Sequence, residues 1–191
     1  MSLPEIIGTL LGVIGVGLMI RQNIWGWPVG LVQVALSAWV FVGAKLYSDA
    51  LLQLFFFALQ AYGWWHWLHG NDASKSLLPV TRLKPQAIAG WCAAGAVATL
   101  GWGELMRRTT DAALPHWDAF ILVFSVISQW WQARKRLENW VGWMVVNLVA
   151  IGVYAAKGLW MFAGLYVVFF GMAVAGHAVW WRTMKGVKAD A

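Results

Sequence analysis

Charged and cysteine residues are scarce in this chain of 191 residues. Only 12% of the residues are charged and 61% are hydrophobic, so a water-soluble domain would lack polar surface. Cys92 is the single cysteine, which excludes an intramolecular disulfide and a metal site built from several cysteines. These shortages indicate an all-α membrane protein, and we expect it to hold no metal and no cofactor.

Catalytic and energy-coupling groups are also missing from the apolar segments. No Asp or Glu falls in the middle of a segment, since Asp49, Glu104 and Asp118 stand at segment ends, and His177 lies well inside the seventh. Proton or sodium coupling usually needs an intramembrane carboxylate, so active symport is disfavoured. The chain has no GxxxxGK[ST] motif for ATP, and no nucleophile lies at a credible spacing from a base. We therefore do not expect an enzyme.

What the sequence does contain is a series of long apolar segments. A membrane span needs about 20 mainly apolar residues, and seven segments approach that length. They are 4–21, 25–44, 50–68, 86–104, 117–133, 139–156 and 159–181. The charged run RKRLE at 134–138 separates two of them and predicts a tight turn at the membrane face. The whole chain, 1–191, is thus predicted to form a single integral membrane domain.

Positive charges predict how these spans are oriented. Cytoplasmic loops of membrane proteins carry an excess of Lys and Arg. One side receives Arg21, Lys75, Arg82, Lys84, Arg134, Lys135, Arg136, Arg182, Lys185 and Lys188, and the other receives Lys45, Arg107, Arg108 and Lys157. We therefore expect a cytoplasmic carboxyl terminus and an external amino terminus. The net charge of +6 is explained by this pattern, so no nucleic-acid partner is expected.

The first three segments resemble the last three when the sequence is shifted by 113 residues. The matches are Arg21 with Arg134, Trp27 with Trp140, Phe56-Phe57 with Phe169-Phe170, Gly63 with Gly176 and Trp67 with Trp180. They predict two parallel three-helix repeats, 4–68 and 117–181, joined by a linker helix at 86–104, as in some transporters. Chance similarity between two apolar triplets is the alternative.

Five uncharged amides interrupt the apolar segments, where hydrocarbon penalises polar groups. They are Gln33, Gln53, Gln60, Gln129 and Asn147. Gln53 and Gln60 are seven residues apart and share one helix face, with Trp64 four residues further on. An amide both donates and accepts hydrogen bonds, so it can bind a hydroxylated or amide-bearing solute. The alternative is that these amides bond helices to one another.

Sixteen tryptophans are present, and most are expected to form belts at the two membrane surfaces. Trp25, Trp27, Trp64, Trp140, Trp160 and Trp180 fall near segment ends. The pairs Trp64/Trp67 and Trp140/Trp143 have the spacing of neighbouring rings on a helix, and an indole face attracts a flat cationic ring. The candidate substrate-binding residues are Gln33, Gln53, Gln60, Trp64, Gln129, Trp140, Trp143, Asn147 and Tyr166.

Four stretches of the chain combine aromatic residues, glycines and amides in a distinctive order: NIWGWPVGLVQVALSAWVF (23–41), KLYSDALLQLFFFALQAYGWWHW (45–67), ARKRLENWVGWMVVN (133–147) and KGLWMFAGLYVVFF (157–170). Together they resemble the PnuC family of bacterial vitamin transporters, which includes nicotinamide riboside (PnuC) and thiamine (PnuT) carriers. By motif, Gln33, Gln60 and Asn147 match polar positions of the family, and Trp140 and Trp143 match its WxxW pair. Gln53 departs from the family, because an Asn is expected there in many nicotinamide riboside carriers.

The resemblance implies a seven-helix, SWEET-like plan in a homotrimer of the bacterial inner membrane. It further implies facilitated diffusion (uniport) of an unphosphorylated vitamin, which a separate cytoplasmic kinase then traps. Nicotinamide riboside is the first expectation for the substrate and thiamine the second. A membrane receptor without flux and a membrane-embedded enzyme are the competing classes; the enzyme ranks last because few ionisable groups lie in the spans.

Overall fold

The computed structural model describes residues 3–43, 47–70 and 78–189, and it is helical almost throughout. Lys45 and Lys75, which entered the charge comparison, lie outside this part of the chain. The helices are α1 (Leu3–Ile20), α2 (Gly26–Gly43), α3 (Tyr47–His69), α4 (Pro85–Thr109), α5 (Pro115–Ala133), α6 (Asn139–Ala156) and α7 (Trp160–Ala189). Each of the seven predicted apolar segments is therefore confirmed as a helix.

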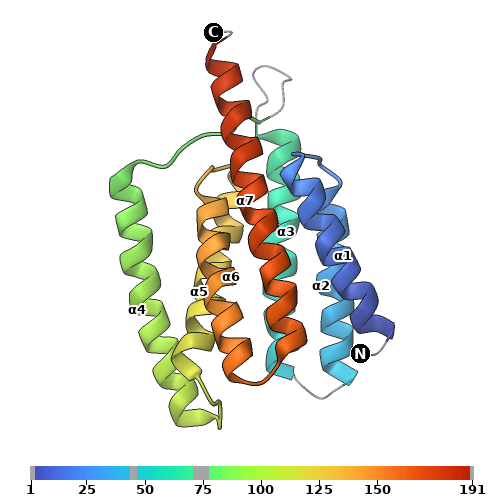
Figure 1. The fold of residues 1–191 in the computed structure, drawn as a ribbon, viewed down its shortest axis with the longest axis vertical. Coiled ribbons are helices and arrows are strands. Elements are labelled where there is room, and N and C mark those ends of the chain that lie inside the picture. The colour runs from blue at the N-terminus through green and yellow to red at the C-terminus, as the bar shows by residue number, and fades with distance from the viewer. Residues whose placement is uncertain (1–2, 44–46, 71–77, 190–191) are drawn as a thin grey trace.

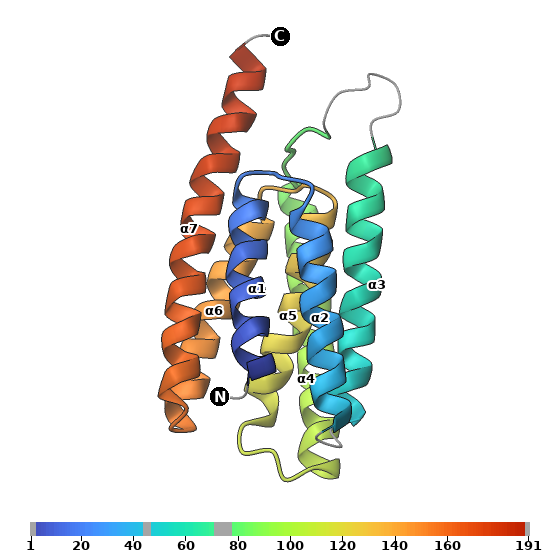
Figure 2. The ribbon, with the colours of Figure 1, turned by 90° about the vertical axis from the view of Figure 1, so that its right-hand side faces the viewer.

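Six of the helices form a closed ring and the seventh lies outside it (Figures 1 and 2). Around the ring, α1 packs on α2, α2 on α3, α3 on α5, α5 on α6, α6 on α7, and α7 on α1. Among the described helices, α4 packs only on α5. The ring therefore encloses a space that is bordered by α1–α3 on one part of its circumference and by α5–α7 on the other.

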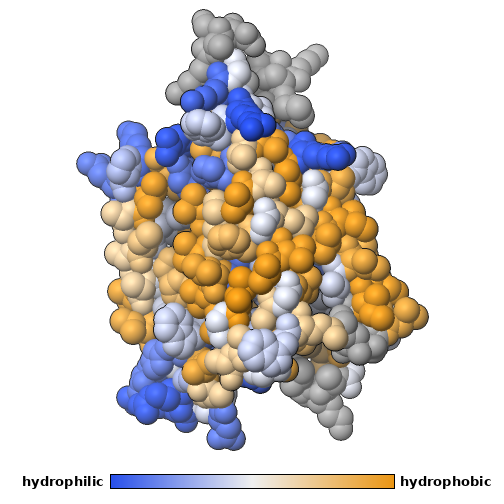
Figure 3. Space-filling view, in the orientation of Figure 1, coloured by the Kyte–Doolittle hydropathy of each residue, from blue (hydrophilic) through white to orange (hydrophobic). Residues whose placement is uncertain are grey.

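The surface of the bundle has the distribution of polarity expected inside a membrane. Figure 3 shows an apolar band across the middle of the face in view, with hydrophilic side chains gathered at its two ends. Within the described residues, α2, α6 and the Trp160–Gly186 part of α7 are long and apolar enough to cross a membrane, and α1 has a shorter apolar stretch, Ile6–Ile20. Amides, charged residues and aromatic side chains with polar atoms make the other helices less hydrophobic.

Tryptophans form the centre of one end of the ring. Trp27, Trp67, Trp140 and Trp180 are at most 7% exposed. The rings of Trp27 and Trp67 meet edge to face at 5.4 Å, as do those of Trp140 and Trp180. Such geometry is favourable between aromatic rings. The expectation that Trp27 and Trp180 belong to an interfacial belt is therefore wrong, because packing inside the bundle buries them.

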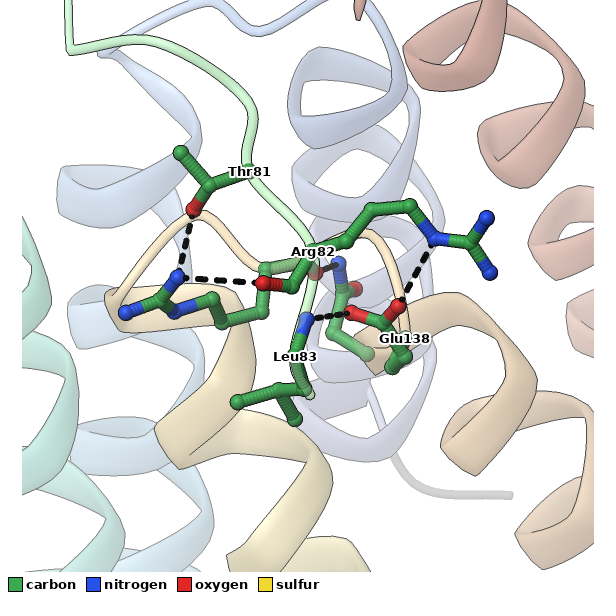
Figure 4. Close-up of polar contacts among 6 residues, drawn as sticks. Thr81, Arg82, Leu83 and Glu138 are labelled. Carbon is green, nitrogen blue, oxygen red and sulfur yellow. Dashed lines mark hydrogen bonds and ion pairs between the residues drawn. The ribbon is translucent and has the colours of Figure 1, made fainter. Parts of the chain in front are cut away.

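The loops at this end of the ring are tied together by hydrogen bonds. The predicted turn at 134–138 is confirmed, and the segment before α4 pairs with it: the Thr81 N–H donates to the Lys135 carbonyl at 3.1 Å. Glu138, which is buried, accepts from the Leu83 N–H at 3.0 Å and pairs with Arg82 at 3.2 Å (Figure 4). These contacts attach the chain leading into α4 to the α5–α6 turn.

Candidate substrate site

A cavity of about 270 Å³ lies inside the ring, and all six ring helices contribute to its wall. Helices α1 and α2 supply small residues, including Gly12, Gly15, Gly26 and Gly30. The polar wall residues are Gln33, Gln60, Gln129, Gln132, Trp140, Trp143, Asn147 and Tyr166. A cavity with apolar walls and a few polar groups is typical of a site for a small organic molecule. We call it the central chamber.

Seven of the nine residues singled out from the sequence line the central chamber. The other two, Gln53 and Trp64, do not. Gln53 shares a helix face with Gln60 but lies about 10 Å from it along the axis, at 1.5 Å per residue. Trp64 is 37% exposed on the outside of the bundle. The structure thus brings together Gln60 with the amides of α5 and α6, and it leaves Gln53 and Trp64 out of this group.

Three chamber amides are free to bind a solute. Within the described residues, the side chains of Gln60, Gln129 and Asn147 make no hydrogen bond to the protein. The Gln60 carboxamide lies against Gly30, where a Cβ atom would overlap it. An unpaired amide inside a membrane protein is unfavourable unless it has a partner. A solute in the chamber could supply that partner.

The fourth candidate amide is differently placed. The Gln33 amide donates to Ser37 Oγ at 3.4 Å, which is one helical turn away, and Ser37 in turn donates to the Gln33 carbonyl at 3.0 Å. Gln33 therefore has a local partner within α2 as well as a place in the chamber wall. Unlike the side chains of Gln60, Gln129 and Asn147, the Gln33 side chain is therefore already hydrogen-bonded without a solute.

The two tryptophans of the WxxW stretch have different surroundings. Trp140 is 1% exposed and packs against Gly176, where an added Cβ would come within 2.6 Å of the indole. Trp143 is half-buried, and its indole N–H donates to Gln132 Oε1 at 3.2 Å. Trp140 is thus almost fully packed although it borders the chamber, whereas Trp143 makes a side-chain hydrogen bond to Gln132 and keeps part of its ring accessible.

Sequence reasoning missed Gln132 as a member of the site. It stands three residues after Gln129, a spacing that places two side chains on the same helix face. That spacing was a usable signal.

Tyr166, which the sequence analysis did single out, has an aromatic environment. Its ring stacks on Tyr154 at 5.1 Å and meets Phe169 edge to face at 6.1 Å.

The chamber wall carries no carboxylate, histidine or basic side chain among the described residues. His177 lies in α7 but is not part of the wall. In addition, no group of three His, Cys, Asp or Glu side chains that could hold a metal occurs in the described part of the chain. The wall is therefore equipped to bind and orient a solute through amides and aromatic rings.

Comparison with known proteins agrees with this chemistry. The family described as nicotinamide mononucleotide transporter matches residues 2–182. The nicotinamide riboside transporter PnuC of Escherichia coli is 26% identical over 204 residues, covering 94% of this chain and 85% of its own length. The riboflavin/roseoflavin transporter RibM of Streptomyces davaonensis is 29% identical over 179 residues, covering 93% and 84%.

A solved structure has the same fold. The crystal structure of the vitamin B3 transporter PnuC superposes with a TM-score of 0.73 and 23% identity, covering 94% of this chain and 80% of that one. These proteins are all named as transporters, which confirms both the resemblance seen in the sequence and the expectation of a transporter in place of an enzyme.

Proposed function

The chain belongs to the nicotinamide mononucleotide transporter family, and we propose that this vitamin transporter carries nicotinamide riboside across the bacterial inner membrane by uncoupled facilitated diffusion. One observation carries the proposal. The amides of Gln60, Gln129 and Asn147 line a chamber inside the ring and, among the described residues, have no protein partner. Because unpaired amides in a membrane are costly, their retention favours a role in binding a polar solute.

The size and chemistry of the chamber favour this substrate over larger ones. Nicotinamide riboside combines a flat cationic ring with a carboxamide and ribose hydroxyls, which suit indole faces and amides. The chamber, at about 270 Å³, is close to the lower end of the ~300–1,000 Å³ usual for small-molecule sites. That volume disfavours a three-ring molecule such as riboflavin. Thiamine, which is also flat and cationic with a hydroxyl, is the second candidate.

Uncoupled transport fits the groups in the chamber wall. A transporter that couples solute movement to protons or sodium normally binds the ion at a carboxylate. The described residues of the chamber wall include no Asp or Glu. The solute would then move down its own gradient. A separate cytoplasmic kinase would phosphorylate it and so prevent its return.

We further propose that α1–α3 and α5–α7 are two parallel repeats that rock about the chamber, joined by α4 in a SWEET-like plan. Reciprocal contacts support this. Trp67 Nε1 donates to the carbonyls of Gln132 and Ala133, at 3.3 and 3.1 Å, and Trp180 Nε1 donates to the Met19 carbonyl at 3.0 Å. The two donors are 113 residues apart, and so are Met19 and Gln132. Each three-helix unit therefore donates an indole hydrogen bond to an equivalent main-chain carbonyl of the other unit.

The positive charges support an orientation with the carboxyl terminus in the cytoplasm. The loops that join α1 to α2 and α5 to α6, and the described segment 78–84 before α4, lie at the same end of the ring as the carboxyl-terminal part of α7 (Figure 1). Under this orientation the buried tryptophans close the cytoplasmic side of the chamber. We retain the proposal of a homotrimer, whose contacts would cover exposed apolar residues of the bundle.

Counterflow in proteoliposomes tests the proposed function. Vesicles loaded with unlabelled nicotinamide riboside should accumulate the labelled compound without ATP or an ion gradient, with the membrane potential held at zero. Thiamine in the external buffer should compete if it shares the site. Strict dependence on a proton or sodium gradient would contradict the uncoupled mechanism.

The same experiment separates a transporter from a membrane receptor. A receptor would bind nicotinamide riboside to the purified protein but would not exchange it across the vesicle membrane. Binding without counterflow would therefore refute transport while leaving the chamber as a ligand site.

A further inference from the structure

Gln132 combines several properties that no other described chamber residue shares. It stands in the last turn of α5, is 6% exposed, and lines the central chamber. Its side chain accepts from Trp143 Nε1, and its main-chain carbonyl accepts from Trp67 Nε1. Gln132 is thus bonded at once to an indole in the chamber wall and to an indole of the opposite helix triplet.

The hydrogen bond to Trp143 fixes which way the Gln132 carboxamide is turned. An indole N–H can only donate, so the atom facing Trp143 must be the carboxamide oxygen. The NH₂ group then occupies the other position. Within the described residues, nothing accepts a hydrogen bond from this NH₂, and it is not among the side-chain atoms sealed inside the protein without a partner. It is an unpaired donor on a residue that lines the chamber.

We propose that Gln132 is a positioning residue for Trp143 and that its NH₂ group is a fixed donor that selects substrates carrying a hydrogen-bond acceptor on the flat ring. The substrate named in this inference rests on the proposed function, whereas the hydrogen bond between Trp143 and Gln132 does not depend on it. The free amides of Gln60, Gln129 and Asn147 can turn to offer either oxygen or nitrogen. Gln132 cannot turn without losing its bond to Trp143, so it discriminates between acceptors and donors.

The proposed selectivity has a simple chemical form. A ring with a carbonyl oxygen, as in the carboxamide of nicotinamide, satisfies the Gln132 NH₂ once Trp143 has stacked on the ring. A ring without that oxygen leaves the donor buried and unpaired when it displaces the chamber solvent, and such a loss lowers affinity by about tenfold. The residue would thereby favour nicotinamide riboside over the same riboside that lacks the carboxamide.

The positioning role is tested in the ligand-free protein with 5-fluorotryptophan and ¹⁹F NMR. The Trp143→Phe variant identifies the Trp143 resonance by its disappearance. That resonance should shift in Gln132→Leu, which removes the acceptor, and should stay closer to its original position in Gln132→Glu, which keeps an oxygen for the indole. A resonance that does not move in Gln132→Leu overturns the positioning role.

The donor role is tested by the ratio of two dissociation constants, those for nicotinamide riboside and for the pyridine riboside without the carboxamide. Both ligands carry the same positive charge, so the added charge of Gln132→Glu cancels from the ratio. Wild-type protein should prefer nicotinamide riboside by about tenfold, and the preference should fall to about twofold or less in Gln132→Glu and Gln132→Leu. Gln53→Leu, outside the chamber wall, serves as the control and should keep the wild-type preference.

The outcomes of the two tests are distinguishable. If wild-type protein binds neither riboside, the proposed function fails and the donor role fails with it, while the fluorine resonance still decides the positioning role. If wild-type protein prefers nicotinamide riboside and Gln132→Glu keeps that preference, the donor role is overturned and the proposed function stands.

Discussion

Replacing Gly176 by alanine should disturb the buried tryptophans and the chamber together. Gly176 lies in α7 against Trp140, and a Cβ atom there would stand 2.6 Å from three carbons of the indole. Real Cβ atoms do not approach so closely, so either α7 or the ring must move. Trp140 is 1% exposed and meets Trp180 edge to face at 5.4 Å, which leaves it little room to retreat.

The magnitude can be worked out from two opposing effects. Overpacking a buried site usually destabilises by about 1–3 kcal/mol. Alanine in place of glycine within a helix contributes up to about 1 kcal/mol in the opposite direction. Gly171 is a matched control, because it lies in the same helix and a Cβ there would meet nothing within 4 Å. Since the helix contribution is common to both, Gly176→Ala should be less stable than Gly171→Ala by about 1–3 kcal/mol.

Thermal unfolding in detergent, followed by tryptophan fluorescence, measures this difference. A gap of several degrees in Tm is expected, at roughly 2–4 °C per kcal/mol for a chain of this size. Because Trp140 lines the chamber, Gly176→Ala should also bind nicotinamide riboside more weakly than Gly171→Ala. Equal Tm values for the two variants would refute the reasoning, since Trp140 would then be free to move.

Three further changes have expected outcomes. Gln60→Ala and Asn147→Ala should each weaken binding of nicotinamide riboside by ~1–3 kcal/mol with near-normal expression, and unchanged affinity by titration calorimetry would show that these amides serve the helices alone. Burial lowers the pKa of Lys135 from the usual 10.5 to about 8, so the cost of burying its charge is complete below pH 8 and fades toward pH 10.5. The Tm of wild-type protein should therefore rise over that interval relative to Lys135→Met, and parallel pH curves would exclude this effect. Glu138→Ala leaves the Leu83 N–H without its acceptor and should cost about 1–3 kcal/mol, whereas Glu138→Gln should retain most of that stability; equal Tm values for the two would contradict it.

The helices were predictable because the physics that forms them is local. Each apolar segment must satisfy its own backbone hydrogen bonds in a membrane, so its length and composition are sufficient to identify it. The turn at 134–138 was predictable from composition as well, since four charged residues within five positions are costly to keep in hydrocarbon. Pairing of the segment before α4 with this turn depends on residues far apart in sequence. Nothing local indicates that the Thr81 N–H bonds to the Lys135 carbonyl.

The candidate site was predictable in kind but not in extent. Amides in apolar helices mark places where a polar group has a purpose, and Gln60, Gln129 and Asn147 do line the chamber. Helix periodicity gives the direction of a side chain around the axis and says nothing of how far a cavity extends along it. Gln53 was therefore grouped with Gln60 although it lies two turns away.

Tryptophan is where sequence reasoning is weakest, because the same residue suits a lipid interface, a buried core and a stacking surface. Trp140 and Trp143 are three residues apart and both line the chamber, yet Trp140 is almost fully packed, with its ring against Gly176, whereas Trp143 is half-buried. The two tryptophans differ in their partners. Gly176 of the neighbouring helix leaves room for the whole Trp140 ring, whereas the Gln132 amide contacts Trp143 through the indole N–H. A glycine 113 residues from another glycine, each opposite a tryptophan, is a signal that the sequence did contain.

The placement of polar groups separates stability from binding in this bundle. At the end of the ring that holds the buried tryptophans, Trp27 and Trp140 pack on Gly63 and Gly176. Trp67 and Trp180 donate to helix-end carbonyls, and these bonds hold α3 to α5 and α7 to α1. The free amides stand apart from these contacts and make no hydrogen bond between helices within the described chain. Loss of an amide should therefore cost affinity with little change in Tm, and loss of a glycine opposite a tryptophan should lower both. If amide variants instead lost stability in proportion to affinity, the amides would be holding the bundle together, and the chamber would lose its best argument for a solute.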